Sequence, residues 1–227
     1  DSYRREHEKA DAKIVFIARS NFLSQVTLDE AALLNHYSNN LALYRNPERI
    51  QVSYVQFDAA TFFPTAEQRM AKQSAEVEQM VNAYYEQRGP DFFKGADGQP
   101  LSAAEAKQRI RDEDVRRSYA LIEAQKSANL LIEALLDMTP KTAEAFEQKA
   151  ADMGLQASVS QPFAQFETPA GAVFPPGFAS TVFQLTPNEP FMEEAAVGTN
   201  AVFVAALKAR FESTPKPFEE VRAQVTS

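Results

Sequence analysis

The sequence predicts an α+β protein in which helix predominates. Apolar residues recur at helical spacing through most of the first 153 residues, and several of these stretches begin with capping sequences. Short runs rich in β-branched and aromatic residues predict a few strands. After Leu155, proline and glycine punctuation with short apolar runs replaces the long helical stripes. We therefore expect a helical region followed by a small C-terminal domain with a short antiparallel sheet.

Two helices are predicted in the first 90 residues. Thr27–Glu30 reads as a capping box, in which the threonine and the glutamate bond each other's backbone amides. The helix it opens is expected to end before Pro47, since the residue preceding a proline disfavours α geometry. Thr65–Gln68 is a second capping box, and Gly89 ends its helix. The apolar stripes of the two helices are Leu34, Tyr37, Leu41 and Tyr44, and Met70, Val77, Val81 and Tyr84.

A third, much longer helix is predicted from Ser102–Glu105, another capping box, to about Met138. Its ~36 residues would span roughly 54 Å at 1.5 Å per residue. That length exceeds one small domain, so we expect this helix to connect two. A further helix is expected to start with Pro140 in its first position and to close at Gly154.

Strands are predicted at Lys13–Ile17 and Val52–Phe57, and a β-hairpin between Glu194 and Leu207 turns around Gly198. A short helix carrying Phe178, Val182 and Leu185 should follow Gly177, and Phe218, Val221 and Val225 form a terminal helical stripe. These elements divide the chain into a strand-and-helix region at 1–100, the connecting helix at 101–138 and a C-terminal domain at 139–227.

A weak internal repeat relates two aromatic pairs at a shift of 48 residues: Tyr37 with Tyr85, and Tyr44 with Phe92. Each predicted helix follows a predicted strand. One strand and one amphipathic helix cannot bury their own apolar faces, so the repeat predicts neighbouring units that share a core. The alternative is that these tyrosines are ordinary core aromatics.

Composition excludes several classes of function. The 227 residues carry 23 Lys+Arg against 31 Asp+Glu, a net charge of −8, which argues against nucleic-acid binding through bulk positive charge. There is no cysteine, and the two histidines are His7 and His36, so a histidine-based metal site or triad in the second half is excluded. Glycine-rich phosphate loops are absent, and no apolar run approaches the ~18 residues of a membrane span. We predict no catalytic, cofactor-binding or metal-binding residues.

Charged residues cluster on the long helix between Lys107 and Arg117, around the consecutive Asp112, Glu113 and Asp114. Consecutive carboxylates fan out around a helix and do not form a catalytic pair. The pattern favours an exposed, salt-bridged helix face, and the alternative is a docking surface for a partner.

The segment from Pro162 to Phe191 holds six phenylalanines with six prolines and two glycines. Aromatic rings give a large contact area at low entropic cost, which suits binding of varied apolar segments. We predict Phe163, Phe166 and Phe174 as substrate-binding rings on the surface, and Phe178 and Phe183 as core residues. The alternative is that most of these rings fill the core of a small domain.

Three stretches of the chain follow a known pattern. The first is the helix, aromatic spacer and strand from Tyr37 to Phe57. The second runs from Phe146 through Phe178-Ala-Ser-Thr-Val-Phe-Gln-Leu185 to Val202-Phe-Val204, and the third is the terminal Pro217-Phe-Glu-Glu-Val-Arg-Ala-Gln-Val225. Together they resemble bacterial SurA/PpiD-type periplasmic folding factors of the parvulin-type peptidyl-prolyl isomerase family, and the second is similar to the second half of a parvulin unit. The resemblance implies a helical chaperone region, a parvulin-like C-terminal domain, the periplasm or an inner-membrane anchor facing it, and exported polypeptides as partners. Such an anchor would lie upstream of Asp1.

The chain departs from that family at its catalytic histidines. An active parvulin is expected to carry one histidine on its first strand and another on its last, whereas no histidine follows His36 here. The sequence therefore favours a chaperone of non-native exported proteins without catalysis and without a cofactor. The alternatives are an active peptidyl-prolyl isomerase and a structural accessory of an envelope complex.

Overall fold

The computed structural model describes residues 13–16 and 29–226, which have the predicted α+β class. The chain divides into two compact units. A terminal unit comprises the described parts of Asp1–Asn46 and Thr214–Ser227, and a sheet unit comprises Pro47–Ser213. This division differs from the expected three consecutive segments. The reason is that the strand near residue 50 pairs with C-terminal strands rather than with a neighbouring repeat.

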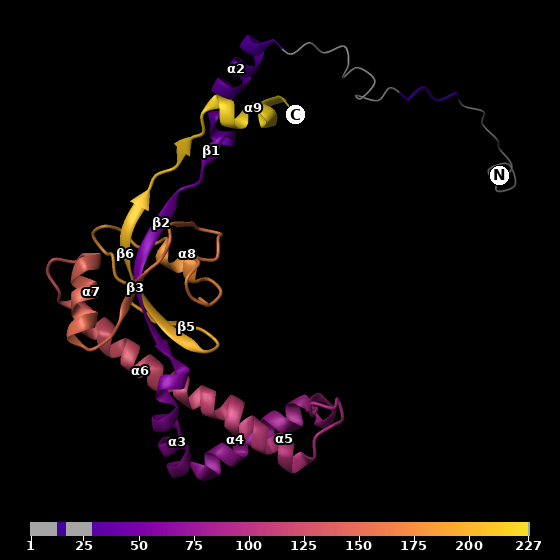
Figure 1. Cartoon of the computed structure of the whole chain (residues 1–227), viewed down its shortest axis with the longest axis vertical. Coiled ribbons are helices and arrows are strands. Elements are labelled where there is room, and N and C mark those ends of the chain that lie inside the picture. Colours follow the sequence, from indigo (N-terminus) through magenta and orange to yellow (C-terminus); the bar gives the residue numbers. More distant parts are fainter. Residues whose placement is uncertain (1–12, 17–28, 227) are drawn as a thin grey trace, which may run out of the picture. The chain divides into compact units, whose positions relative to one another are not determined.

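The sheet unit is built on one antiparallel sheet with the strand order β3-β2-β6-β5 (Figure 1). Its centre is β2 (Arg49–Asp58) paired along its length with β6 (Ala201–Phe211). Three short strands flank this pair: β3 (Ala157–Val159) and β4 (Phe163–Ala164) on β2, and β5 (Ala196–Val197) on β6. The strand predicted at Val52–Phe57 and the hairpin predicted between Glu194 and Leu207 are confirmed.

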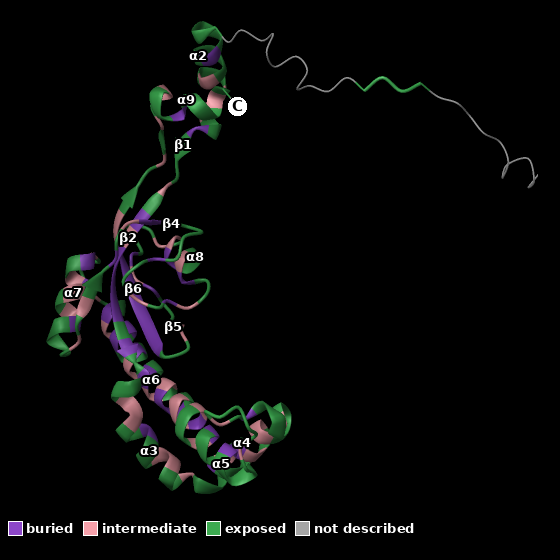
Figure 2. Cartoon of the chain, turned by 45° about the vertical axis from the view of Figure 1, so that its right-hand side comes forward, coloured by how far each residue is buried: buried purple, intermediate pink, exposed green. Residues whose placement is uncertain are grey.

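Alternating residues of the central strands point to two separate apolar layers. On one face, Ile50, Val52 and Tyr54 pack with Phe203 beneath α8 (Phe178–Val182) and the loop that precedes it. On the other face, the sheet packs against α6 (Arg116–Leu136) and α7 (Ala143–Asp152). Figure 1 shows α8 on one side of β2 and β6 and α7 on the other. Because both faces are covered, the central strands are continuously buried over residues 52–55 and 201–207 (Figure 2).

The long helix is confirmed, with a change of pitch inside it. It runs through α5 (Ala103–Arg109), the π-helical η5 (Ile110–Val115) and α6, and the predicted capping box at Ser102 is present. Its first half packs in a third apolar cluster with α3 (Phe63–Lys72) and α4 (Ser74–Arg88), and its second half covers the sheet. The helix therefore links two apolar clusters within the sheet unit, not two domains as expected.

Helix boundaries agree only partly with the predictions, and the single helix predicted from Thr65 to Gly89 is in fact two helices, α3 and α4, which are separated at Gln73. α3 follows the 3-10 turn η3 (Ala59–Phe62) and begins at Phe63, with Pro64 in its first turn, instead of at a Thr65 capping box. α7 begins at Ala143, where the Thr142 hydroxyl accepts from the Ala145 amide at 3.2 Å, so Pro140 does not start it. Gly89 ends α4, as predicted, with a positive φ of 77°. The 3-10 turn η4 (Pro90–Phe92) follows it.

The terminal unit pairs α2 (Glu30–Asn39) with α9 (Phe218–Thr226), and η2 (Leu41–Leu43) leads to a two-stranded ladder of β1 (Arg45–Asn46) and β7 (Thr214–Pro215). The Tyr37 ring lies 5.8 Å from Tyr44 and 5.5 Å from Phe218, and its hydroxyl donates to the Lys216 carbonyl at 2.6 Å. The predicted terminal helix is confirmed. The first helix is shorter than predicted because Leu41–Leu43 tightens into a 3-10 turn. Its N-cap is Asp29, whose side chain accepts from the Ala31 amide. Thr27 lies outside the described residues.

The predicted repeat is only partly reproduced. Tyr85 stacks on Phe93 at 5.7 Å, much as Tyr37 lies beside Tyr44, but the predicted partner Phe92 is 57% exposed. Residues 13–16 form no strand and are exposed, and Ile17 lies outside the described residues. Tyr37 and Tyr85 also belong to different compact units, so the expected shared core between repeats is wrong.

Candidate functional site

An aromatic and proline-lined hollow lies between β4 and α8 on the α8 face of the sheet. It has a volume of about 400 Å³ and is lined by residues 165–169 and 174–180, which we call the aromatic groove. The lining combines the rings of Phe166, Phe174 and Phe178 with three prolines. The prolines fix φ and lack a backbone N–H group, which limits the conformations of the loop that forms the wall.

The base of the aromatic groove is held by stacked rings. Phe174 stacks on Phe178 at 4.4 Å and meets Phe203 and Tyr54 at 5.0 Å each. Gly171 has a φ of 109°, and a Cβ atom there would lie 3.4 Å from the Tyr54 hydroxyl oxygen. The positive φ therefore favours glycine where the loop passes Tyr54.

The three predicted substrate-binding rings do not lie together on the surface. Phe166 is 93% exposed, whereas Phe163 and Phe174 are 3% and 8% exposed. Their predicted exposure is wrong for a specific reason: Phe163 belongs to β4, which pairs with β2, and Phe174 stacks in the core. Phe178 is buried as predicted, and Phe183 packs partly buried against the same cluster.

A second exposed apolar side chain in the same loop, Val173, was not predicted. It is 90% exposed. A single valine between alanine and phenylalanine carries no sequence signal for exposure. The loop thus presents Phe166 and Val173 to solvent while Phe174 anchors it. Phe166 also lines the hollow, and an exposed apolar side chain in such a place is typical of interaction sites.

The polar groups of the aromatic groove are suited to shaping it and not to proton transfer. The Glu167 carboxylate accepts from the Ala164 amide at 2.9 Å and pairs with Arg49 at 3.7 Å, so it closes the turn after β4. No histidine is present in the sheet unit, because none follows His36 in the sequence. The groove can therefore bind apolar groups, but its lining contains no acid–base pair.

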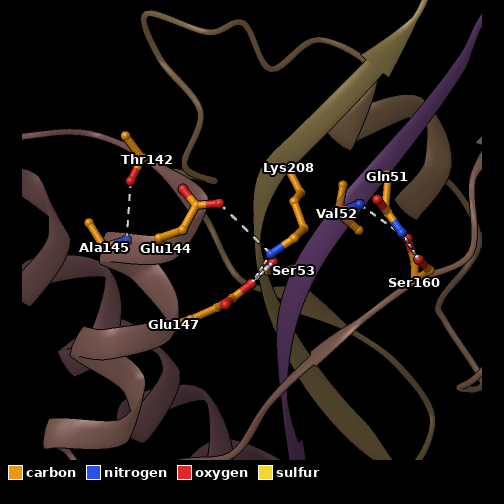
Figure 3. A network of polar contacts seen from close by, with 9 residues as sticks. All are labelled: Gln51, Val52, Ser53, Thr142, Glu144, Ala145, Glu147, Ser160 and Lys208. Carbon is orange, nitrogen blue, oxygen red and sulfur yellow. Dashed lines mark hydrogen bonds and ion pairs between the residues drawn. The ribbon is translucent and has the colours of Figure 1, made fainter.

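A polar network on the opposite face of the sheet is the other concentration of chemically capable side chains (Figure 3). The Ser53 hydroxyl donates to Glu147 Oε1 at 2.5 Å, and Lys208 Nζ donates to the same oxygen at 2.6 Å. These hydrogen bonds, that from Lys208 first, hold the pKa of Glu147 below its ordinary value of 4.5, against the opposing effect of partial burial. Ser53 is fully buried, so no substrate can reach its hydroxyl, and the network serves to fasten α7 to the sheet.

This network predicts an acid-sensitive contribution to stability. A carboxylate with a depressed folded-state pKa stabilises fully above its unfolded pKa, near 4.5, and loses that stabilisation as the pH falls through the lower folded value. We expect Glu147→Gln to lower the free energy of unfolding by about 1–2 kcal/mol at neutral pH, because the carboxylate is only partly exposed.

Urea denaturation of wild type and variant across the acid range measures this difference, which should narrow below pH 4.5. Glu144→Gln is the matched control, since Glu144 lies 3.9 Å from the same lysine but is 74% exposed. It should leave stability nearly unchanged. A Glu147→Gln difference of equal size at every pH would contradict the assignment.

The charged face of the long helix is salt-bridged, as predicted, but many of its pairs reach other helices. Arg111 pairs with Glu78 on α4, and Arg116 with Glu67 on α3 at 3.1 Å. The Arg116 guanidinium also lies 4.4 Å from the centre of the Phe63 ring. These contacts fasten the helices to one another, which supports a structural role for this face.

The remaining sequence candidates offer no site. His36 is exposed in the last turn of α2, and His7 lies outside the described residues. Within residues 13–16 and 29–226, no group of three or more histidine or acidic side chains could hold a metal ion. No helix in that part of the chain is long and apolar enough to cross a membrane.

Comparison of the chain with protein-family models, curated proteins and solved structures found no match. The similarity to parvulin-type folding factors therefore depends on the residue patterns of this sequence alone.

Proposed function

We propose that this chain is a folding chaperone that holds non-native exported polypeptides and does not act on them chemically. One observation carries the proposal: Phe166 exposes 93% of its surface beside a 400 Å³ hollow that is walled by prolines and aromatic rings. A large apolar ring gains free energy when it leaves water, so an exposed one beside a hollow favours contact with an apolar partner.

The groove suits partners of varied sequence. Its apolar walls present rings and proline carbons, which attract side chains by area rather than by a specific hydrogen-bond pattern. The stacked Phe174 and Phe178 keep the hollow open while Phe166 projects from it. A net charge of −8 supports contact through apolar surface rather than attraction of acidic segments.

The place of action belongs to the same proposal. The resemblance to SurA/PpiD-type factors implies the periplasm, or an inner-membrane anchor facing it, and exported proteins as clients. The absence of cysteine suits an oxidising compartment, where a stray thiol would be reactive.

Phe166→Ser tests the proposal directly. Burying a phenylalanine contributes about 1.5–3 kcal/mol, so we expect at least about tenfold more of the variant to be needed to suppress aggregation of a denatured outer-membrane protein. Light scattering measures the aggregation. Phe92→Ser is the matched control, since Phe92 is also an exposed phenylalanine but lies outside the groove.

Both variants should keep the wild-type circular dichroism and melting temperature, because neither ring is buried. Equal protection by the wild type and Phe166→Ser would exclude the groove as the client site. Absence of protection by the wild type itself would favour the structural accessory instead.

An active isomerase is the alternative that the family resemblance raises, and we predict that it is wrong. The two central strands, β2 and β6, carry no histidine, and the space between Tyr54 and Phe203 is filled by Phe174. We expect no acceleration of cis/trans exchange in an Xaa-Pro peptide beyond the uncatalysed rate, whose barrier is about 18–20 kcal/mol. A rate increase that disappears in Phe178→Ala would overturn this prediction.

A further inference from the structure

A second surface, separate from the aromatic groove, combines an apolar floor with unpaired negative charge. Three adjoining hollows of about 80, 510 and 370 Å³ follow the segment that leads into β5. The first two lie against the end of α6, and the third lies against Thr181 of α8 and the residues that follow this helix. All three share Glu193 in their lining. We call them together the acidic groove.

The floor of the acidic groove is apolar and fixed in position. Leu136 of α6 is 59% exposed, and beside it lie Ile132, Phe191 and Met192. The Met192 amide donates to the Ala205 carbonyl at 3.0 Å, and the Leu207 amide donates to the Pro190 carbonyl at 2.8 Å. The segment is thus tied to β6 before any partner arrives, so binding would order little additional backbone. Methionine adapts its shape readily to different partners.

The rim of the acidic groove is strongly negative. Its lining holds four exposed glutamates, Glu133, Glu189, Glu193 and Glu194, against a single lysine, Lys141. None of the four glutamates forms an ion pair with any residue that the structure describes. Two carboxylates of η5 differ in this respect: Glu113 pairs with Arg109, and Asp114 pairs with Arg117.

We propose that the acidic groove binds a basic amphipathic segment of a partner polypeptide. Lysine or arginine side chains of the partner pair with the rim glutamates, and an apolar side chain between them covers Leu136. Charge complementarity selects this occupant: an acidic segment would be repelled, and an uncharged apolar one would leave the rim without counter-charges. The inference stands independently of client binding at the aromatic groove.

The test uses the full chain and a fluorescent synthetic peptide of lysine, leucine and alanine, followed by fluorescence anisotropy. Two comparison peptides replace either every lysine by glutamate or every leucine by serine. We expect binding of the first peptide alone. Affinity should fall steeply between low and high salt, since the Debye length shrinks from about 30 Å at 0.01 M to about 3 Å at 1 M.

Two matched pairs of variants locate the site. The triple variant Glu189→Gln, Glu193→Gln and Glu194→Gln should bind about tenfold more weakly, which corresponds to about 1.4 kcal/mol. Its control, Glu86→Gln, Asp91→Asn and Glu212→Gln, changes the net charge equally outside the groove and should bind as the wild type does. Leu136→Ser should also weaken binding, whereas Leu130→Ser, on the same helix and 57% exposed, should not.

Several results would overturn the proposal. Equal weakening by the two triple variants would show general charge attraction, and equal binding of the serine-containing peptide would show that the apolar floor is not used. A dimer of this chain that Leu136→Ser dissociates would identify a second copy as the occupant. Phe166→Ser should leave peptide binding unchanged, so failure of this proposal and failure of the chaperone proposal are distinguishable.

Discussion

Replacing Phe174 by alanine is expected to lower the free energy of unfolding of the sheet unit by about 3–5 kcal/mol. Phe174 is 8% exposed and touches three other aromatic rings, those of Tyr54, Phe178 and Phe203. Removing its ring would leave a cavity in the middle of the cluster on the α8 face. Urea denaturation followed by circular dichroism measures the change.

Phe166→Ala is the matched control, because it removes the same side chain from the same loop at 93% exposure. It should change stability by no more than about 0.5 kcal/mol. The pair separates two roles within one loop: Phe174 holds the loop on the sheet, and Phe166 is available for binding. Similar losses for both variants would show that Phe166 is packed, and would remove the basis of the chaperone proposal.

Replacing Leu131 by alanine is expected to lower the free energy of unfolding by about 2–5 kcal/mol. Leu131 is fully buried where α6 crosses the sheet, in the cluster with Val55, Phe57 and Val204. The loss should appear as a lower midpoint of urea denaturation with an unchanged slope.

Leu130→Ala provides a control one residue away, since Leu130 is 57% exposed on the outer side of the same helix. Both variants make the same chemical change in the same helix, so helix propensity cancels in the comparison. Equal losses of stability in the two variants would mean that α6 does not lie against the sheet through the face that carries Leu131. The acidic groove, which uses the end of α6, would then lose its floor.

The two proposals assign different surfaces of the sheet unit to different partners. The aromatic groove offers apolar area with few unpaired charges, and the acidic groove offers an apolar floor within a negative rim. Exported polypeptides contain both apolar and basic segments. A chaperone with both surfaces would hold one client at two points, which raises the effective concentration of each contact.

Local features of this chain were predictable from its sequence because their causes are local. The capping box at Ser102, the helix end at Gly89 and the short helix from Phe178 depend on hydrogen bonds and backbone preferences within a few residues. The strand near Val52 and the final hairpin followed from runs of β-branched and aromatic residues. The absence of histidine from the sheet unit is likewise a property of the sequence alone.

Only the tertiary structure decided which distant segments meet. β2 pairs with β6 about 150 residues further on, which moved the strand from the expected N-terminal repeat into the sheet unit. Ser53, Glu147 and Lys208 converge across 94 and 61 residues, and no spacing in the sequence announces their network. Phe163, Phe166 and Phe174 are alike in the sequence but not in burial, because pairing of β4 with β2 covers the first and ring stacking covers the third. Burial depends on neighbours that the fold brings from far along the chain, whereas periodicity and capping depend on neighbours in sequence.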